Sequence, residues 1–551
     1  MPTKYIFVSG GVISGLGKGV TTASIALLLQ SRGYRVTPVK CENYLNFDAG
    51  LINPIEHGDP YLCEDGTEAD MDMGTYEKFL GQNMLRHNFI TMGQIYRAVI
   101  ERERNFGYEG EDVEAIPHVT DEILRRIKEA GEKGNAEIVA VELGGTAGEY
   151  QNALYYEASR ILSLDKRNRV VHVHVSYLPT PPHLGEPKTK PTQLSVRTLN
   201  SMGIQPDFIV ARAEKPMDER RRKRFALFCN VDPENVIDSV DLANPYEAPL
   251  YLAKQKLDLK ILKMLELPEK SLEISGWSQM VEKSKIRKTT AVTIAIVGKY
   301  FATGEYQLRD SYAALIDAID HASWQQGVET KVKWIQAEKL EKGDPAELKD
   351  VDGIIVPIGW GSRGAEGKIT AAGYARVNKI PYLGLCYGMQ LAVVEYARNV
   401  LKLVKAHTLE CDPATPHPVI HMVSGQKEIL KRRAYGGTMR LGRWECCVKE
   451  ATLTDNCYLK HGGYDDPVNK IVGERHRHRY EFNDHYAKQF EEAGLVIAGR
   501  SKLENLVEVI ELPRAIHPFF LGTQYHPEYR SRPLLPHPIF LEFVSACTKK
   551  V

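Results

Sequence analysis

The cysteine at position 386 has the surroundings of a catalytic nucleophile. It stands in the run Gly384–Gly388, directly after the apolar stretch Tyr382–Leu385 and before a helix-like segment. Small residues on each side permit the sharp strand-to-helix turn that exposes a nucleophile and aims backbone N–H groups at a developing oxyanion. A helix N-terminus also favours the thiolate. The alternative interpretation is a buried structural cysteine, the commonest role of free cysteines.

Two residues near the C-terminus favour the catalytic interpretation. His526 and Glu528 follow the apolar stretch Phe519–Tyr525. The histidine can take the thiol proton as a general base, and the glutamate can orient the imidazole. This combination resembles the class I glutamine amidotransferases. The resemblance implies that Cys386, His526 and Glu528 form a triad that makes a glutamyl thioester and frees ammonia.

A glycine-rich loop near the N-terminus is typical of phosphate binding. The strand-like stretch Tyr5–Ser9 leads into Gly10–Gly19, and a helix is predicted from about Val20. Glycines let backbone N–H groups converge on a phosphate, and Lys18 adds a full positive charge. The match to the generic P-loop is imperfect, because Gly19 takes the place of the usual hydroxyl residue. A glycine-rich turn without a ligand is the alternative, and the strand–loop–helix context favours nucleotide binding.

Two carboxylates are candidates for a magnesium site. Asp72 ends the acidic run Glu64–Asp72, and Glu142 lies near the carboxyl end of the apolar stretch Ile138–Leu143, where open α/β sheets bind ligands. Mg²⁺ prefers one or two carboxylates together with substrate phosphates. A solvated loop is the alternative for the acidic run, whereas apolar residues and glycines flank Glu142.

Anionic substrates must be held by local basic clusters, since Lys+Arg and Asp+Glu balance at 71 each. The segment Lys188–Gln193 offers two ammonium groups and an amide, and Arg220–Arg224 is strongly basic. Each segment can also be interpreted as solvated surface. The balanced charge predicts no nucleic-acid or membrane partner.

The composition is that of an ordinary globular protein with more than one domain. A chain of 551 residues is too long for a single core, and 43% of its residues are hydrophobic. The N-terminus lacks a signal-peptide design, and no eighteen apolar residues run together. Nine cysteines without zinc-site spacing predict reduced thiols in a cytoplasmic protein.

Short apolar runs alternate with amphipathic segments, which predicts an α/β fold with mostly parallel sheets. The pattern dissolves around Leu267–Thr290 and resumes at Val292–Val297. We therefore predict a first domain at residues 1–270, a linker at 271–290 and a second domain at 291–551. The proline-containing segment Cys411–Lys427 is predicted to be a surface loop.

Taken together, the motifs resemble the CTP synthase family over nearly the whole chain. The resemblance rests on Ser9–Gly19, Glu64–Gly74, Ile116–His118, Glu142–Gly148, Lys188–Gln193, Gly203–Asp207, Ala226–Val231, Gly298–Tyr300, Arg363–Lys368, Gly437–Gly442 and Glu474–Glu481. It implies a P-loop-type amidoligase domain followed by a class I glutamine amidotransferase domain. It also implies that ATP phosphorylates the 4-oxygen of UTP. Ammonia from Cys386, carried through an internal passage, then displaces the phosphate to give CTP.

The family's functional positions carry over residue by residue. Lys18 and Lys40 are expected to be catalytic beside the triad, and Asp72 and Glu142 are expected to bind Mg²⁺. ATP binding is expected of Gly15, Leu16, Gly17, Lys18, Gly19, Val20, Asp72 and Asp241. UTP or CTP binding is expected of Ser14, Glu149, Gln151, Lys188, Lys190, Gln193 and Arg224. Glutamine binding is expected of Gly359, Gln390, Glu410 and Arg479, with GTP as an activator near Arg363. A homotetramer that stacks into filaments is also implied.

The sequence departs from the family pattern near the pyrimidine nucleotide. The family's Asp-Pro becomes Glu42-Asn43, its Gly-Asp-Ile-Glu ends in Gln151, and its Thr-Gln-His ends in Leu194. A lysine becomes Arg224, and in the glutaminase half a glycine becomes Ile358. Three hypotheses follow: a CTP synthase with altered UTP affinity or CTP feedback, a paralogue that amidates another pyrimidine-like nucleotide or carbonyl, and an idle scaffold. The intact triad and Lys18 argue against the last.

Overall fold

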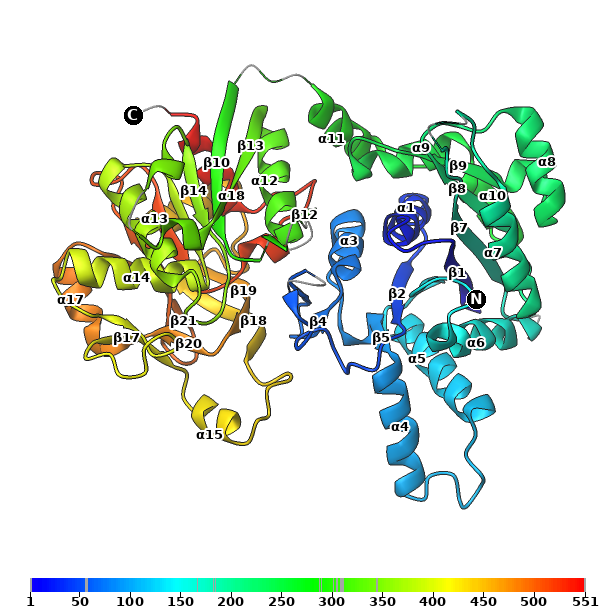
Figure 1. Cartoon of the computed structure of the whole chain (residues 1–551), viewed down its shortest axis with the longest axis horizontal. Coiled ribbons are helices and arrows are strands. Elements are labelled where there is room, and N and C mark those ends of the chain that lie inside the picture. Colours follow the sequence, from blue (N-terminus) through cyan, green and yellow to red (C-terminus); the bar gives the residue numbers. More distant parts are fainter. Residues whose placement is uncertain are drawn as a thin grey trace. The chain divides into compact units, whose positions relative to one another are not determined.

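The computed structural model describes residues 2–549 except 55–57, 166, 182, 184, 287, 289, 301, 304–305, 308–311 and 343–344. The chain folds into two compact units (Figure 1). We name them the N-terminal unit, Met1–Ala49 with Asp72–Val281, and the C-terminal unit, Gly50–Met71 with Glu282–Val551. Within the described ranges, no helix is long and apolar enough to cross a membrane.

The N-terminal unit is built on a sheet with the strand order β5-β2-β6-β1-β7-β8-β9, and every neighbouring pair is parallel. The strands are β1 (Lys4–Gly11), β2 (Val36–Glu42), β5 (Phe89–Thr91), β6 (Ile138–Leu143), β7 (Val170–Tyr177), β8 (Phe208–Ala213) and β9 (Val236–Val240). Their near-continuous apolar runs are buried on both faces, as parallel strands require. This confirms the predicted parallel α/β architecture.

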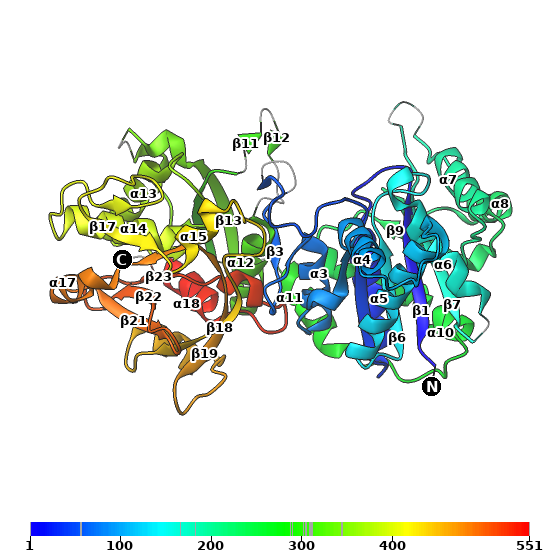
Figure 2. The same ribbon diagram turned by 90° about the horizontal axis from the view of Figure 1, so that it is seen from below.

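Helices cover both faces of this sheet. Helices α1, α9 and α10 pack on one face, and Figure 2 shows α4, α5 and α6 side by side in front of the strands on the other. The helices are α1 (Lys18–Ser31), α3 (Met71–Leu80), α4 (Met92–Arg104), α5 (Thr120–Lys133), α6 (Ala153–Leu164), α7 (Lys190–Ser201), α8 (Glu219–Cys229), α9 (Ala248–Lys254), α10 (Leu257–Met264) and α11 (Ser275–Lys285). Helix α11 lies within the predicted linker 271–290.

The C-terminal unit has a mixed sheet with the order β13-β10-β14-β15-β23-β22-β21-β18-β19. Pairing is parallel from β13 to β23 and antiparallel from there to β19. The strands are β10 (Thr290–Gly298), β13 (Val328–Gln336), β14 (Gly353–Val356), β15 (Tyr382–Leu385), β18 (Arg440–Val448), β19 (Ile471–His478), β21 (Val496–Ser501), β22 (Val507–Leu512) and β23 (Phe520–Thr523).

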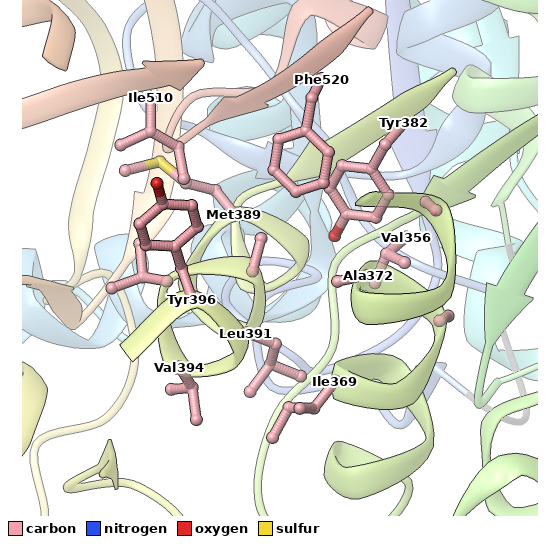
Figure 3. Packing of buried hydrophobic residues seen from close by; sticks show 14 of the residues in the cluster. Val356, Ile369, Ala372, Tyr382, Met389, Leu391, Val394, Tyr396, Ile510 and Phe520 are labelled. Atoms are coloured by element: carbon pink, nitrogen blue, oxygen red, sulfur yellow. The ribbon is translucent and has the colours of Figure 1, made fainter. Parts of the chain in front are cut away.

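An apolar layer joins helices α13 (Ala365–Asn378) and α14 (Tyr387–Asn399) to this sheet. Figure 3 shows Tyr382 and Phe520 next to Met389, and the two rings stack 4.6 Å apart. A second apolar cluster lies under α12 (Ala313–Gln326), α16 (Leu453–His461) and α18 (Pro538–Cys547). Packing on both faces fixes β15 and β23, the strands that carry the predicted triad.

The secondary structure of the C-terminal unit differs from the sequence prediction in two places. The predicted surface loop Cys411–Lys427 instead contains β17 (Pro418–Met422), which pairs with β16 (His407–Thr408) and β20 (Tyr480–Phe482), and the start of α15 (Gln426–Lys431). Val419 and Ile420 are fully buried there, which explains why the segment is ordered. The prediction also missed β18 and β19, because charged residues break the apolar pattern in both strands.

The segment Gly50–Met71, which lies within the predicted first domain 1–270, packs in the C-terminal unit. It forms a short hairpin of β3 (Tyr61–Leu62) and β4 (Glu68–Ala69). Arg475 donates to Glu64 at 3.0 Å, and Arg477 donates to Glu68 at 2.7 Å. These buried ion pairs hold the hairpin against β19. The domain limits drawn from the sequence stay a prediction.

Candidate active site

Cys386 occupies a strained turn between β15 and α14. Its backbone has φ 51° and ψ −100°, which a residue with a side chain rarely adopts and which is typical of a nucleophile elbow. The flanking glycines are required because a Cβ at Gly388 would overlap the carbonyl of Val356, and one at Gly384 would meet Gly388. The local sequence thus folds so that the thiol sits at the helix N-terminus.

His526 follows β23 and is held from two sides. Its backbone N–H donates to the carbonyl of Arg475 at 2.9 Å, and its ring Nδ1 lies 2.8 Å from Oε1 of Glu528. Burial disfavours the imidazolium, but the Glu528 carboxylate and the nearby Cys386 outweigh it and raise the pKa of His526 to about 10. Among the described residues, Nε2 of His526 has no hydrogen-bond partner. This nitrogen can therefore exchange a proton with the thiol or with a substrate.

The Cys386 sulfur has two polar neighbours. The thiol donates to the carbonyl of Arg477 across 3.8 Å, and Nε2 of Gln524 donates to the sulfur across 3.4 Å. The three predicted triad residues thus lie in one buried site. They are Cys386, His526 and Glu528. An acyl-transfer reaction is what such a site can perform.

Two buried lysines hold the loop Pro357–Arg363 by its carbonyl groups. Lys368 donates to Pro357 and Ile358 at 2.8 and 3.3 Å, and Lys299 donates to Trp360 and Arg363. Burial lowers the pKa of both lysines. Because the carbonyls face the lysines, the peptide planes of this loop are fixed. The Ile358 side chain, which stands where the family pattern has glycine, is 2% exposed and joins the core.

The predicted glutamine-binding residues surround this loop in part. Glu410 accepts from the N–H of Gly361 at 2.7 Å, and Gln390 donates to Gln524 at 3.2 Å. Gly359 lies against Lys368, where a Cβ would collide with the ammonium group. Arg479 instead donates to Tyr435 at 2.7 Å and to Thr438 at 3.0 Å, so α15 and the residues after it position its guanidinium.

The GTP prediction concerns Arg363, whose side chain is 53% exposed. Its guanidinium pairs with Glu338 and donates to the carbonyl of Lys299 at 2.8 Å. Arg363 ends the loop Pro357–Arg363, which also carries Gly359 and Gly361.

The phosphate loop in the N-terminal unit has the predicted form. Gly15 and Gly17 have φ of 73° and 83°, a conformation that favours glycine, and Gly17 caps α1. Lys18 lies across Gly10 and donates to the carbonyl of Gly145 at 2.9 Å. Burial lowers the pKa of Lys18. The N-terminus of α1 and this lysine together provide the positive potential that an anion site requires.

Lys40 links the predicted metal ligands. Its Nζ contacts Asp72, Glu142 at 2.8 Å and Glu42 at 3.2 Å. Burial and the Asp72 charge raise the pKa of Glu142 to about 7, although Lys40 and Lys18 oppose them. Gly19 lacks a hydroxyl for a structural reason, since a Cβ there would overlap the Asp72 carboxylate.

These carboxylates fit a magnesium ion that also binds phosphate. Glu142 is buried and Asp72 is partly buried beside it, and Mg²⁺ suits one or two such carboxylates together with phosphate oxygens. No cluster of three or more His, Cys, Asp or Glu side chains suited to a metal occurs in the described ranges. The substrate would therefore have to complete the coordination.

A cavity of about 130 Å³ adjoins the phosphate loop. Gly15, Leu16, Gly17 and Val20 line it together with Arg212, Ser239, Leu242, Pro245, Ala248 and Tyr251. Asp241 accepts from Arg212 at 2.9 Å at its rim. Four of the predicted ATP residues thus line one cavity together with apolar groups, whereas Lys18, Gly19, Asp72 and Asp241 are not part of its lining.

Comparison with known proteins agrees with both halves of the site. Residues 4–267 match the family model "CTP synthase N-terminus", and residues 307–546 match "Glutamine amidotransferase class-I". CTP synthases of Thermococcus kodakarensis and Sulfurisphaera tokodaii are 46% and 48% identical, over 100% and 99% of this chain and 99% of their own lengths. The chain belongs to the CTP synthase family. A solved glutaminase domain of Trypanosoma brucei CTPS with bound acivicin matches 47% of this chain and 95% of its own, at 33% identity and TM-score 0.41.

As a CTP synthase family member, the chain is a ligase with a glutamine amidotransferase domain, which confirms the predicted family and enzyme class. The residues predicted to bind UTP or CTP are spread over separate loops and helices. They are Ser14 in the phosphate loop, Glu149 and Gln151 after β6, Lys188, Lys190 and Gln193 at the start of α7, and Arg224 on α8. Across the described ranges, no hydrogen bond or ion pair joins one of these side chains to another. Glu149 instead accepts from Thr146 at 2.6 Å and from Asn43 at 3.0 Å.

Three residues of the two sites escaped the sequence prediction. Tyr76 donates to Glu142, Lys368 holds the loop beside Cys386, and Gln524 donates to the sulfur. Gln524 stands two residues before His526, so its place next to the catalytic motif was the one available signal. Lys368 ends the family-like motif Arg363–Lys368, whereas Tyr76 reaches its site through the fold alone.

Proposed function

We propose that the C-terminal unit hydrolyses glutamine at Cys386 and that the N-terminal unit uses ATP to put the released ammonia on C4 of UTP, which gives CTP. The observation that carries the proposal is the Cys386 elbow with its paired His526 and Glu528. The family's curated members are called CTP synthases, which supports UTP over another carbonyl acceptor.

In the glutaminase reaction, His526 takes the proton of the Cys386 thiol. The sulfur attacks the amide carbon, and backbone N–H groups of the lysine-held loop and the elbow stabilise the oxyanion. His526 then protonates the amine, ammonia leaves, and water hydrolyses the thioester to glutamate. Gly359, Gln390, Glu410 and Arg479 would hold the substrate.

In the ligase reaction, the 4-oxygen of UTP attacks the γ-phosphorus of ATP, and ADP leaves. Ammonia adds at C4 and phosphate departs, which makes CTP. Lys18 and Lys40 neutralise the transferring phosphoryl group, and Asp72 and Glu142 would hold Mg²⁺, which screens the same charge. An internal passage between the two reactions would keep the ammonia unprotonated.

The remaining roles are proposals that rest on the family resemblance. They are ATP binding by Gly15, Leu16, Gly17, Lys18, Gly19, Val20 and Asp241, and pyrimidine nucleotide binding by Ser14, Glu149, Gln151, Lys188, Lys190, Gln193 and Arg224. GTP would activate the glutaminase near Arg363, and homotetramers would stack into filaments.

An oxygen-isotope experiment tests the ligase step. The protein is incubated with UTP labelled with ¹⁸O at position 4, together with ATP, Mg²⁺, GTP and ammonium. We expect CTP and one ¹⁸O atom per released phosphate, because the labelled oxygen leaves with the phosphoryl group. CTP formation with unlabelled phosphate would contradict the phosphorylated intermediate, and turnover of a different acceptor only would contradict UTP as the substrate.

A further inference from the structure

We propose that Gln524 is a catalytic residue of the glutaminase reaction, which stabilises the Cys386 thiolate by donating a hydrogen bond from its side-chain amide. This inference rests on the proposed role of Cys386 as the nucleophile. Gln524 is 1% exposed, and its Nε2 lies 3.4 Å from the sulfur. An N–H donor stabilises a sulfur that carries negative charge more than a neutral thiol.

The surrounding carbonyl groups fix the orientation of this amide. Gln390 uses its Nε2 to donate to the carbonyl of Tyr480 at 2.8 Å, so its amide nitrogen must face that way. The same Nε2 donates to Oε1 of Gln524 at 3.2 Å. If Gln524 were flipped, two amide nitrogens would face each other. The backbone carbonyl of Tyr480 therefore forces Gln524 to present its nitrogen, a donor, to Cys386.

The main chain fixes the position of Gln524 as well. Its backbone N–H donates to the carbonyl of Glu508 on β22 at 2.8 Å. The amide thus reaches the sulfur from a rigid strand end, with both ends of its side chain bonded. Such a donor is preorganised, because it needs no rearrangement when charge develops on the sulfur.

The other groups around the sulfur do not replace this donor. The carbonyl of Arg477 is an acceptor and favours the neutral thiol, which it holds at 3.8 Å. The charged groups that act on Cys386 are His526, paired with Glu528, and the buried Lys368, whose ammonium group is bonded to Pro357 and Ile358. His526 must give up its proton during the reaction, so among these described side chains Gln524 is the donor to the sulfur that remains throughout, alongside the N-terminus of α14.

Alkylation of Cys386 measures this effect directly. The rate of iodoacetamide labelling is followed from pH 5 to 10 by peptide mass spectrometry, for the wild-type protein, Gln524→Met and Gln524→Glu. We expect the pH midpoint of Cys386 labelling to rise by about one unit in Gln524→Met. It should rise further in Gln524→Glu, because a carboxylate repels the thiolate. Glutamine-dependent kcat/KM should fall about tenfold in Gln524→Met.

The exposed Gln489 on α17 (Ala487–Glu492) provides a matched control, and Gln489→Met should keep the wild-type profile. Ammonia-dependent CTP synthesis and the circular dichroism of each variant report whether it folds. Identical labelling profiles of wild type and both Gln524 variants would overturn the role of Gln524. If Cys386 of the wild type reacts no faster than Cys411 or Cys447, the nucleophile itself is wrong, and the proposed function of Cys386 fails first.

Discussion

At the scale of single residues, buried charge controls the phosphate-binding site. Glu142 is 1% exposed and lies beside Asp72, so a second negative charge there is costly. Lys40 and Tyr76 offset part of this cost through their contacts with Glu142. A divalent cation would offset the rest, and it must replace a proton wherever Glu142 is protonated.

Mg²⁺ binding should therefore depend on pH through Glu142. Its pKa of about 7 means that Mg²⁺ displaces a proton below pH 7, so affinity should increase as the pH rises towards 7 and level off above it. Calorimetric titration of Mg²⁺ with a non-hydrolysable ATP analogue, in buffers of different ionisation enthalpy, measures both affinity and proton release. Glu142→Gln should bind at least tenfold more weakly and release no proton. Equal proton release by the variant would contradict this assignment.

The sequence could predict functional residues that lie near the end of an apolar strand. Glu142 lies one residue before the end of β6, and His526 follows β23, so each was expected near the carboxyl end of a strand. Tyr76 could not be predicted, because a tyrosine within α3 resembles any core residue. The catalytic roles themselves stay predictions until they are tested.

At the scale of elements, β19 is a strand rich in charged residues, and the side chains on both of its faces make polar contacts. Arg475 and Arg477 point to the Gly50–Met71 hairpin, while Glu474 and His476 contact groups on the opposite side, His537 and Arg440. The carbonyls of Arg475 and Arg477 also contact His526 and Cys386. The hairpin thus positions the strand that borders the nucleophile. Apolar periodicity could not reveal such a strand, since its buried residues are ion-paired.

Removal of one ion pair should weaken this element. In Glu68→Gln, the buried Arg477 keeps Asp59 at 3.4 Å but loses its closest carboxylate, at 2.7 Å. We expect the free energy of unfolding of the C-terminal unit to fall by about 2 kcal/mol, measured by calorimetry. The control Glu445→Gln breaks an exposed pair with Lys502 and should change it by less than about 0.5 kcal/mol. Equal losses in the two variants would contradict a structural role for Glu68.

At the scale of the whole molecule, the sequence predicted most of the parallel core, whereas the long-range packing of the hairpin lay beyond it. Strands β6 and β15 have the bounds that their apolar runs predicted, because buried parallel strands are apolar throughout. The pairing of Glu64 with Arg475 joins residues 411 positions apart. No local pattern encodes such a contact, so the packing of the hairpin against β19 could not be predicted from the sequence.

The proposed ammonia release and the proposed ligase reaction use residues of different units, so one variant can separate the two reactions. Cys386 lies in the C-terminal unit, and Lys18 and Lys40 lie in the N-terminal unit. Removing the sulfur should stop ammonia release without touching the phosphate site. Ammonia added to the solution should then restore the product.

The decisive measurement is CTP formation from UTP and ATP by Cys386→Ala, with glutamine or with ammonium as the nitrogen source. We predict that glutamine-dependent synthesis falls at least 10³-fold, because no other group replaces the nucleophile. Ammonia-dependent synthesis should stay within about twofold of wild type, since the ligase residues are unchanged. Loss of both activities in a folded protein, or normal synthesis from glutamine, would contradict the account.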